Sequence, residues 1–202
     1  GWYGFNAGSA LAANGSAGMA LFVTHIAASA GALTWMTCEW VKFGKPSGLG
    51  IVTGMVAGLG TITGAAGVVG PAGALVIGVL AGVICFFMTQ LIKKTLKIDD
   101  SLDVFPVHGV GGVLGTLLAG IFCSPDLGVF SGFGYAAGHD SMASQLGIQI
   151  LGIVVIASYT AMLTWLLLKL TSLLTKGLRV SDDEEREGLD LVSHDERGYD
   201  LN

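Results

Sequence analysis

Apolar residues fill six long segments of the chain, and short polar or glycine-containing breaks separate them. We expect helices over residues 1–12, 19–40, 48–67, 72–95, 104–123 and 144–175. Several of these segments approach the roughly 20 apolar residues with which an α-helix crosses a bilayer. The last is long enough to project beyond the bilayer. The pattern therefore predicts an all-α fold, a polytopic membrane helix bundle.

The distribution of charge supports this partition. The chain is 52% hydrophobic and 12% charged, whereas a soluble domain carries about 25% charged residues. When the six helices alternate in direction, all ten Lys and Arg residues fall on one side of the membrane. Basic residues accumulate on the cytoplasmic side. We therefore expect a multi-pass protein with a cytoplasmic C-terminus.

Small residues recur at helical spacing. Gly50, Gly54 and Gly58 lie four residues apart, and Gly78 and Gly82 repeat the interval in the next segment. In membranes this spacing favours close helix–helix contact. The three cysteines Cys38, Cys85 and Cys123 are far apart in sequence and lie in or at the ends of apolar segments, where we expect them as buried small side chains. No metal site is expected.

The composition changes near the C-terminus. We divide the chain into a transmembrane domain, 1–179, and an acidic cytoplasmic tail, 180–202. From residue 181 the tail holds nine acidic and two basic residues. A disordered, solvated tail is one interpretation. A segment that docks a partner is the other, because apolar residues interrupt the acidic run: Leu189, Leu191, Val192, Tyr199 and Leu201.

The stretch "DVFPVHGVGG" places a histidine in an apolar segment. Asp103 is expected to cap the helix, with Pro106 in its first turn and His108 about one turn inside. His108 is expected to share a face with small residues: Gly112, Gly115 and Ala119. An ionisable residue in a membrane helix is usually functional. We expect His108 to be buried near mid-membrane, and a structural bond to a neighbouring helix remains the alternative.

The N-terminal "WYGFNAGS" carries a second candidate site. Trp2, Phe5 and Ser9 share one helix face, which suits either a helix core or a vestibule for a cation. His25 is interpreted mainly as structural. The sequence contains no nucleophile–base pair, phosphate loop or zinc spacing. We therefore expect no enzyme activity, no cofactor and no nucleic-acid partner.

These motifs together resemble the ammonium transporter family (Amt/Mep/Rh). "GWYGFNAGS" is similar to the sixth helix of the family, "DVFPVHGVGG" to the tenth, and "GLRVSDDEEREGLDLVSHDERGY" to the bacterial C-terminal tail. "EWVKFGKPSGLG" and "TGAAGVVGPAGAL" resemble the region from the seventh to the ninth helix. The family fold has eleven helices, as two inverted five-helix repeats plus a long last helix, assembled as a trimer. The resemblance covers the second repeat and the last helix, and the start at Gly1 is interpreted as the interior of a longer protein.

The resemblance implies roles for individual residues. His108 would be one of two pore histidines, Phe5 one of two stacked gate phenylalanines, and Ser9 part of an outer ammonium site, with Trp2 near the vestibule. The other pore residues would belong to an N-terminal half. A PII-type signal protein would bind the tail, and the candidate contacts are Glu187, Leu189, Leu191 and Tyr199. The bacterial inner membrane is the implied location.

The sequence leaves three candidate functions to be tested. The first is transport of ammonium or ammonia through a hydrophobic pore. The second is an ammonium sensor that acts through its tail. The third is a purely structural membrane bundle, which requires that His108 be dispensable.

Overall fold

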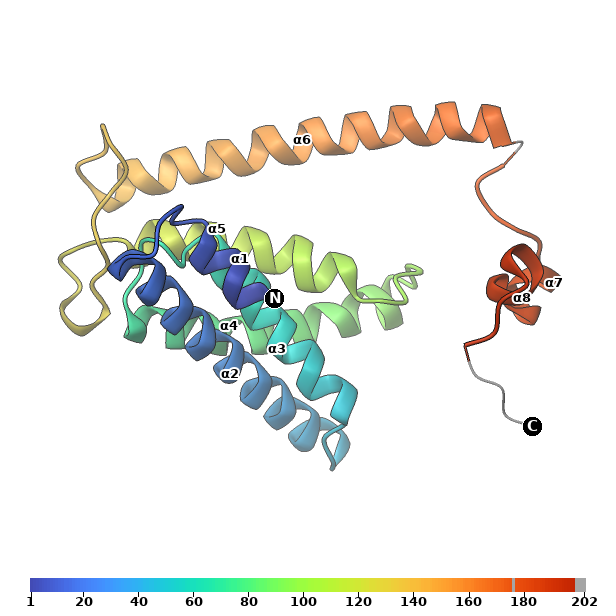
Figure 1. Cartoon of the computed structure of the whole chain (residues 1–202), viewed down its shortest axis with the longest axis horizontal. Helices are drawn as coiled ribbons and strands as arrows, with labels where there is room; N and C mark the ends of the chain where they lie inside the picture. The colour runs from blue at the N-terminus through green and yellow to red at the C-terminus, as the bar shows by residue number, and fades with distance from the viewer. Residues whose placement is uncertain (176, 199–202) are drawn as a thin grey trace. The chain divides into compact units, whose positions relative to one another are not determined.

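The computed structural model describes residues 1–175 and 177–198, and within them the chain is all-α, as the sequence predicts (Figure 1). The α-helices are α1 (Trp2–Gly8), α2 (Gly15–Phe43), α3 (Gly48–Thr63), α4 (Pro71–Gln90), α5 (Gly111–Phe122), α6 (Met142–Thr175), α7 (Asp182–Glu187) and α8 (Leu189–His194). Two π-helical segments, η1 (Leu91–Thr95) and η2 (Phe105–Val110), extend α4 and precede α5. A 3-10 turn, η3, covers Gly128–Phe130.

The chain divides into two compact units, with the boundary between Ile153 and Val154 inside α6. In the described residues, four helical stretches are long and apolar enough to cross a membrane: Gly15–Phe43, Pro71–Thr95, Phe105–Phe122 and Met142–Thr175. The apolar helix Gly48–Thr63 is shorter. The class of a polytopic membrane helix bundle is thus confirmed.

Local sequence signals explain where the helices begin. The break "ANGS" starts α2, because Asn14 is its N-cap and accepts a hydrogen bond from the backbone N–H of Ala17 at 3.1 Å. Ser47 caps α3 in the same way through Gly50, at 2.9 Å. Glu39, near the end of α2, accepts from the backbone N–H of Ser47 at 2.7 Å and so closes the turn between the two helices.

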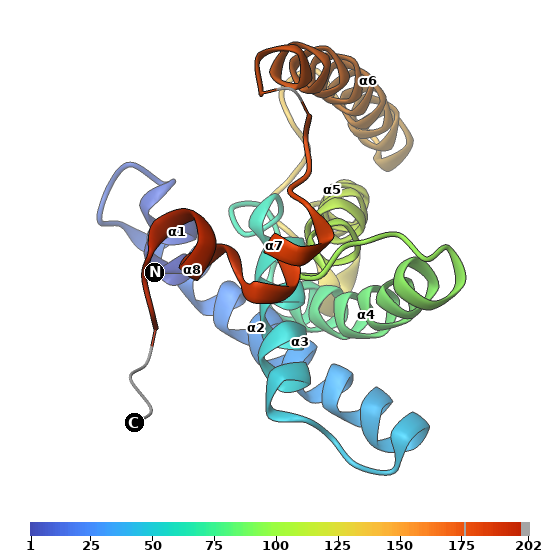
Figure 2. The ribbon, with the colours of Figure 1, turned by 90° about the vertical axis from the view of Figure 1, so that its right-hand side faces the viewer.

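Glycine lets three helices of the first unit meet at one point. Figure 2 shows α2, α3 and α4 as neighbouring ribbons. Gly58 of α3 and Gly78 of α4 both approach the carbonyl of Ala27 in α2, and a Cβ at either glycine would overlap that carbonyl. The close contact predicted from the glycine spacing is therefore present. Around it lies a core of side chains with no exposed surface: Val23, Ala27, Ile62, Ala65, Val69, Ala74 and Ile77.

The described part of the tail contains two short helices. Ser181 caps α7 with a capping box, since its hydroxyl accepts from the N–H of Glu184 at 3.3 Å and the Glu184 carboxylate accepts from the N–H of Ser181 at 2.8 Å. The motif S-x-x-E that signals this cap is visible in the sequence. The tail is not uniformly irregular, although it is strongly acidic.

Candidate functional site

The short helix α1 is tied to both of its neighbours. The indole Nε1–H of Trp2 donates to Thr63 Oγ1 of α3 at 2.8 Å. The amide Nδ2–H of Asn6 donates to Thr24 Oγ1 of α2 at 3.0 Å, and both of these residues are buried. These bonds fix which face of α1 turns inward and which remains open.

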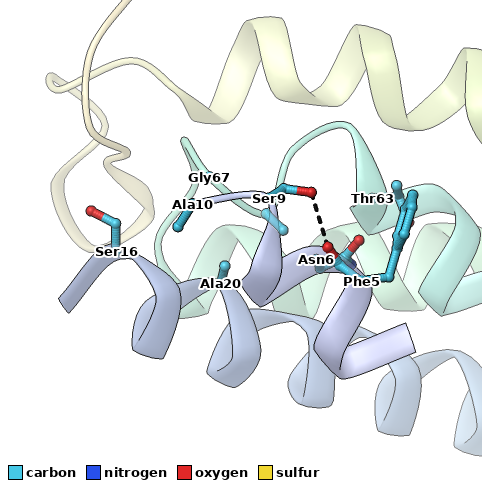
Figure 3. Close-up of a pocket in the computed structure, with 9 residues that line it drawn as sticks. Phe5, Asn6, Ser9, Ala10, Ser16, Ala20, Thr63 and Gly67 are labelled. Atoms are coloured by element: carbon cyan, nitrogen blue, oxygen red, sulfur yellow. Dashed lines mark hydrogen bonds between the residues drawn. The ribbon is translucent and has the colours of Figure 1, made fainter. Parts of the chain in front are cut away.

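The open face of α1 carries two of the predicted site residues. Phe5 is 63% exposed, and Ser9 is exposed with its hydroxyl donating to the Phe5 carbonyl at 2.9 Å. Both line a pocket of about 340 Å³ (Figure 3), together with Asn6, Thr63 and small residues of α2 and the turn after α3. In this view Phe5 and Thr63 lie at one end and Ser16 at the other. An aromatic ring and a hydroxyl thus share one wall.

The third residue of the predicted stripe, Trp2, lies against His108. The indole and imidazole rings are nearly parallel, with an interplanar angle of 8° and centroids 6.2 Å apart. Aromatic rings attract one another in such offset arrangements. The structure therefore brings together Trp2 of the first helix and His108 of η2, which are 106 positions apart in the chain.

The environment of His108 differs from the expectation that it is buried. In this chain the residue is exposed. Trp2 covers one face of the imidazole, and Gly60 of α3 faces its Nδ1 without a side chain to cover it. His108 also borders a second cavity, of about 570 Å³, lined also by Val104, Phe105 and Asp100. His108 thus contacts the Trp2 indole and also lines a largely apolar groove.

The expected cap Asp103 is corrected by the structure. The side chain of Asp100, not that of Asp103, accepts from the backbone N–H groups of Val104 and Phe105, each at 2.9 Å. Asp103 adopts a left-handed backbone conformation and pairs with Lys93 of η1 at 2.7 Å. The cause is that the helix begins as a π-turn, which changes the position of the free N–H groups.

The small residues on the face expected for His108 have different neighbours. An added Cβ at Gly115 would overlap the Thr61 carbonyl of α3, whereas a Cβ at Gly112 would meet nothing within 4 Å. His108 also lies near α3, since a Cβ at Gly60 would be 3.7 Å from its Nδ1. The shared face therefore stays a prediction. No signal in the sequence identified the π-helical segment η2.

Several residues of the site were not singled out from the sequence: Asn6, Thr24, Thr63 and Tyr3. The Tyr3 hydroxyl lies 3.1 Å from His25 Nδ1, which gives His25 a contact with α1. In the tail, Glu187 ends α7, while Leu189 and Leu191 belong to α8. Leu189 is exposed and Leu191 is half-buried. Tyr199 lies outside the described residues.

The fold and the site together define the class: a multi-pass membrane protein whose helices leave an aromatic and histidine-bearing face open. The model of the Ammonium Transporter Family matches residues 1–199. The chain belongs to the ammonium transporter family.

Individual relatives agree with this assignment. The chain is 45% identical to the "Ammonium transporter" of Aquifex aeolicus, over all of this chain and 46% of that protein. It is 43% identical to "Ammonium transporter Amt1" of Archaeoglobus fulgidus, over 98% of this chain and 49% of that protein. The chain spans about half the length of the curated relatives it matches.

Solved structures show the same likeness. The structure titled "Sensor Amt Protein" superposes with a TM-score of 0.83 at 34% identity, over 94% of this chain and 45% of that one. Mep2 of Saccharomyces cerevisiae superposes with a TM-score of 0.78 at 36% identity, over 90% of this chain and 41% of that one.

Proposed function

We propose that this chain forms one wall of a membrane path for ammonium or ammonia. The observation that carries the proposal is the near-parallel Trp2–His108 pair beside the pocket that Phe5 and Ser9 line. Membership of the ammonium transporter family and the names of the relatives support ammonium as the substrate.

The residues suit the chemistry of a small hydrated cation. Ammonium loses hydration on entering an apolar path, which is costly for a lone charge. The ring faces of Phe5 and Trp2 attract a cation. The Ser9 hydroxyl, whose proton is donated to the Phe5 carbonyl, keeps lone pairs that accept from ammonium N–H groups. Phe5 is proposed as a gate and Ser9 as part of the recruitment site.

His108 is proposed as the pore histidine. A neutral imidazole donates at one ring nitrogen and accepts at the other. It can therefore hold ammonia or pass a proton where little water is present. Its contact with the Trp2 indole and its place in the lining of the groove with Phe105 support this role.

The test is uptake of the ammonium analogue methylammonium by cells in which the native gene carries His108→Ala. We expect uptake to fall by about tenfold or more at equal protein level, or its selectivity to change. His139→Ala is the matched control. His139 lies in the loop before α6, outside the site, and its Nδ1 is 2.7 Å from the Ser144 hydroxyl oxygen. Wild-type flux and current in His108→Ala would remove the pore-histidine role.

We propose that a complementary half of the transporter supplies the opposite wall, and that the assembly is a homotrimer in a bacterial inner membrane. The exposure of His108 and Phe5 in this chain supports a missing wall. The segregation of all ten basic residues supports a cytoplasmic C-terminus. This polypeptide alone, reconstituted into liposomes, should give no saturable ammonium-driven pH change. Saturable transport by that preparation would contradict the proposal.

An ammonium sensor is the second candidate function. It is favoured by the likeness to a structure whose title describes a sensor Amt protein and by the two helices in the tail. A sensor would lose its ammonium-dependent signal to a partner when the tail is removed, whereas a transporter without a sensing role has no such signal to lose. The ammonium-dependent response of the partner, measured with and without residues 180–202, separates the two functions.

A further inference from the structure

The hydroxyl protons of the two threonines that bind α1 are both already used in other hydrogen bonds. Thr63 Oγ1 donates to the Leu59 carbonyl at 2.7 Å, and Thr24 Oγ1 donates to the Ala20 carbonyl at 2.6 Å. Each bond runs back one turn of the threonine's own helix, as threonines in helices often do. A hydroxyl has a single proton. Both hydroxyls therefore have only lone pairs left for α1.

The donors on α1 match these two acceptors. Trp2 presents an indole N–H, which can donate but not accept, and Asn6 presents its amide NH₂. Because each threonine has already used its proton, the bonds have one direction only: from Trp2 to Thr63 and from Asn6 to Thr24. The donor and the acceptor of such a bond cannot exchange roles. The bond therefore holds the donor side chain in one position.

The helix α1 needs this support. It has seven residues, fewer than an isolated helix requires in order to form. Thr24 and Thr63 lie on different helices, α2 and α3, and they bind residues four positions apart on α1. Two fixed points one turn apart set the position of the helix along its axis and its rotation about that axis. Those two quantities decide where the Trp2 ring lies and which way Phe5 and Ser9 face.

We infer that Thr24 and Thr63 are positioning residues of the proposed path, which hold the Trp2 indole parallel to His108 and keep Phe5 and Ser9 on the open face. The inference rests on the proposed function, and neither hydroxyl needs to touch the transported species. Thr63 acts directly on the indole, and Thr24 acts through Asn6.

The test replaces the acceptor with a side chain of the same shape. Thr63→Val in the native gene removes the lone pairs that the indole N–H needs, whereas Thr63→Ser keeps them. Thr53→Val is the matched control on α3, because Thr53 makes the same back-bond, to Leu49 at 2.9 Å, and accepts nothing from α1. Thr37→Val is the corresponding control for Thr24→Val on α2, because the Thr37 hydroxyl donates to the Leu33 carbonyl at 2.8 Å.

Two readouts are required. The indole N–H band in ultraviolet resonance Raman spectra of the purified protein should shift to that of an unbonded indole in Thr63→Val, but not in Thr63→Ser or Thr53→Val. Methylammonium uptake should fall by about tenfold in Thr63→Val, since a donor loses its acceptor, and Thr63→Ser should restore it. Thr24→Val should lower uptake without moving the indole band to the same extent.

The outcomes separate this inference from the proposed function. An indole band that does not move in Thr63→Val overturns the inference whatever His108→Ala does. A shifted band with wild-type uptake also overturns it, provided that His108→Ala abolishes uptake. If His108→Ala is silent as well, the proposed function itself fails.

A second approach is available if Thr63→Val does not accumulate in the membrane. Site-specific incorporation of benzothienylalanine at position 2 keeps the ring shape of Trp2 and removes its N–H. The same loss of uptake is expected, and normal uptake with this analogue contradicts the positioning role.

Discussion

Helices α4 and α6 are both long and apolar, yet they are packed very differently. In the stretch that α4 forms with η1, 44% of the most apolar window is buried. Gly78 and Gly82 of α4 contact the backbone of α2, while a Cβ at Gly147 or Gly152 of α6 would meet nothing within 4 Å. Hydropathy therefore identifies a helix that can cross the membrane, and close glycine contacts identify what it packs against.

The contrast extends to the two units. The first unit holds the proposed path, and every side-chain bond that positions Trp2, Phe5 or Ser9 lies within it. The unit that begins at Val154 holds the outer part of α6 and the two helices of the tail. The proposed path thus lies in the first unit, and the candidate tail residues lie in the second.

The largest expected effect tests this division directly. A chain that ends at Arg179 should lose capture of a PII-type regulator altogether, while methylammonium uptake by the complete transporter persists. The reason is that the exposed Leu189 offers an apolar contact that an acidic segment otherwise lacks. Pull-down of the purified regulator measures the effect.

A point variant controls for the truncation. Leu189→Ser should weaken capture by about tenfold, as loss of an apolar anchor does at protein interfaces. Ser193→Ala, on the same short helix, should leave it unchanged. Equal capture by the chain ending at Arg179 and by the full chain would remove the tail's role.

A second prediction compares glycines in the two packing environments. Gly115→Ala forces a methyl group against the Thr61 carbonyl. Overpacking of this kind costs about 1–3 kcal/mol of unfolding free energy. Gly112→Ala on the same helix and Gly152→Ala on α6 have open space at the Cβ, so both should unfold within about 0.5 kcal/mol of the wild type. Thermal unfolding in detergent measures all three. A destabilisation by Gly152→Ala equal to that of Gly115→Ala would show that α6 is tightly packed.

The sequence predicted the helical class, the six apolar segments and the family well, because these depend on hydrophobicity and on local spacing. Each of the six segments contains a helix. The glycine interval correctly indicated close helix contact, and the structure adds that α2 is the partner of α3 and α4, where only a residue without a side chain fits.

The sequence predicted the geometry around His108 less well. The cap is Asp100 and not Asp103, next to the π-helical segment η2, and a π-helical segment has no periodicity signal of its own. The acceptors Thr24 and Thr63 were missed for another reason. Their role arises from contacts across 18 and 61 positions, which no local pattern records.

The smallest expected effect concerns the start of α7, in the second unit. The Ser181 hydroxyl and backbone N–H both donate to the Glu184 carboxylate, and these bonds lower the pKa of Glu184 from its ordinary value of 4.5. A carboxyl whose folded pKa is depressed stabilises the folded state above its unfolded pKa, and this stabilisation is lost as the pH falls through the folded pKa. The protection factors of the α7 amides, which correct for the intrinsic pH dependence of exchange, should therefore fall as the pH drops below about 4.5, the unfolded value for Glu. Ser181→Ala should return the pKa of Glu184 toward its ordinary value and speed exchange at neutral pH, whereas Ser193→Ala should change neither. Titration of the Glu184 carboxyl by NMR measures the shift. If Glu184 titrates at the same pH in the wild type and in Ser181→Ala, the capping box does not form in solution. The helix α7 would then lack the cap that orders its start, close in sequence to Leu189.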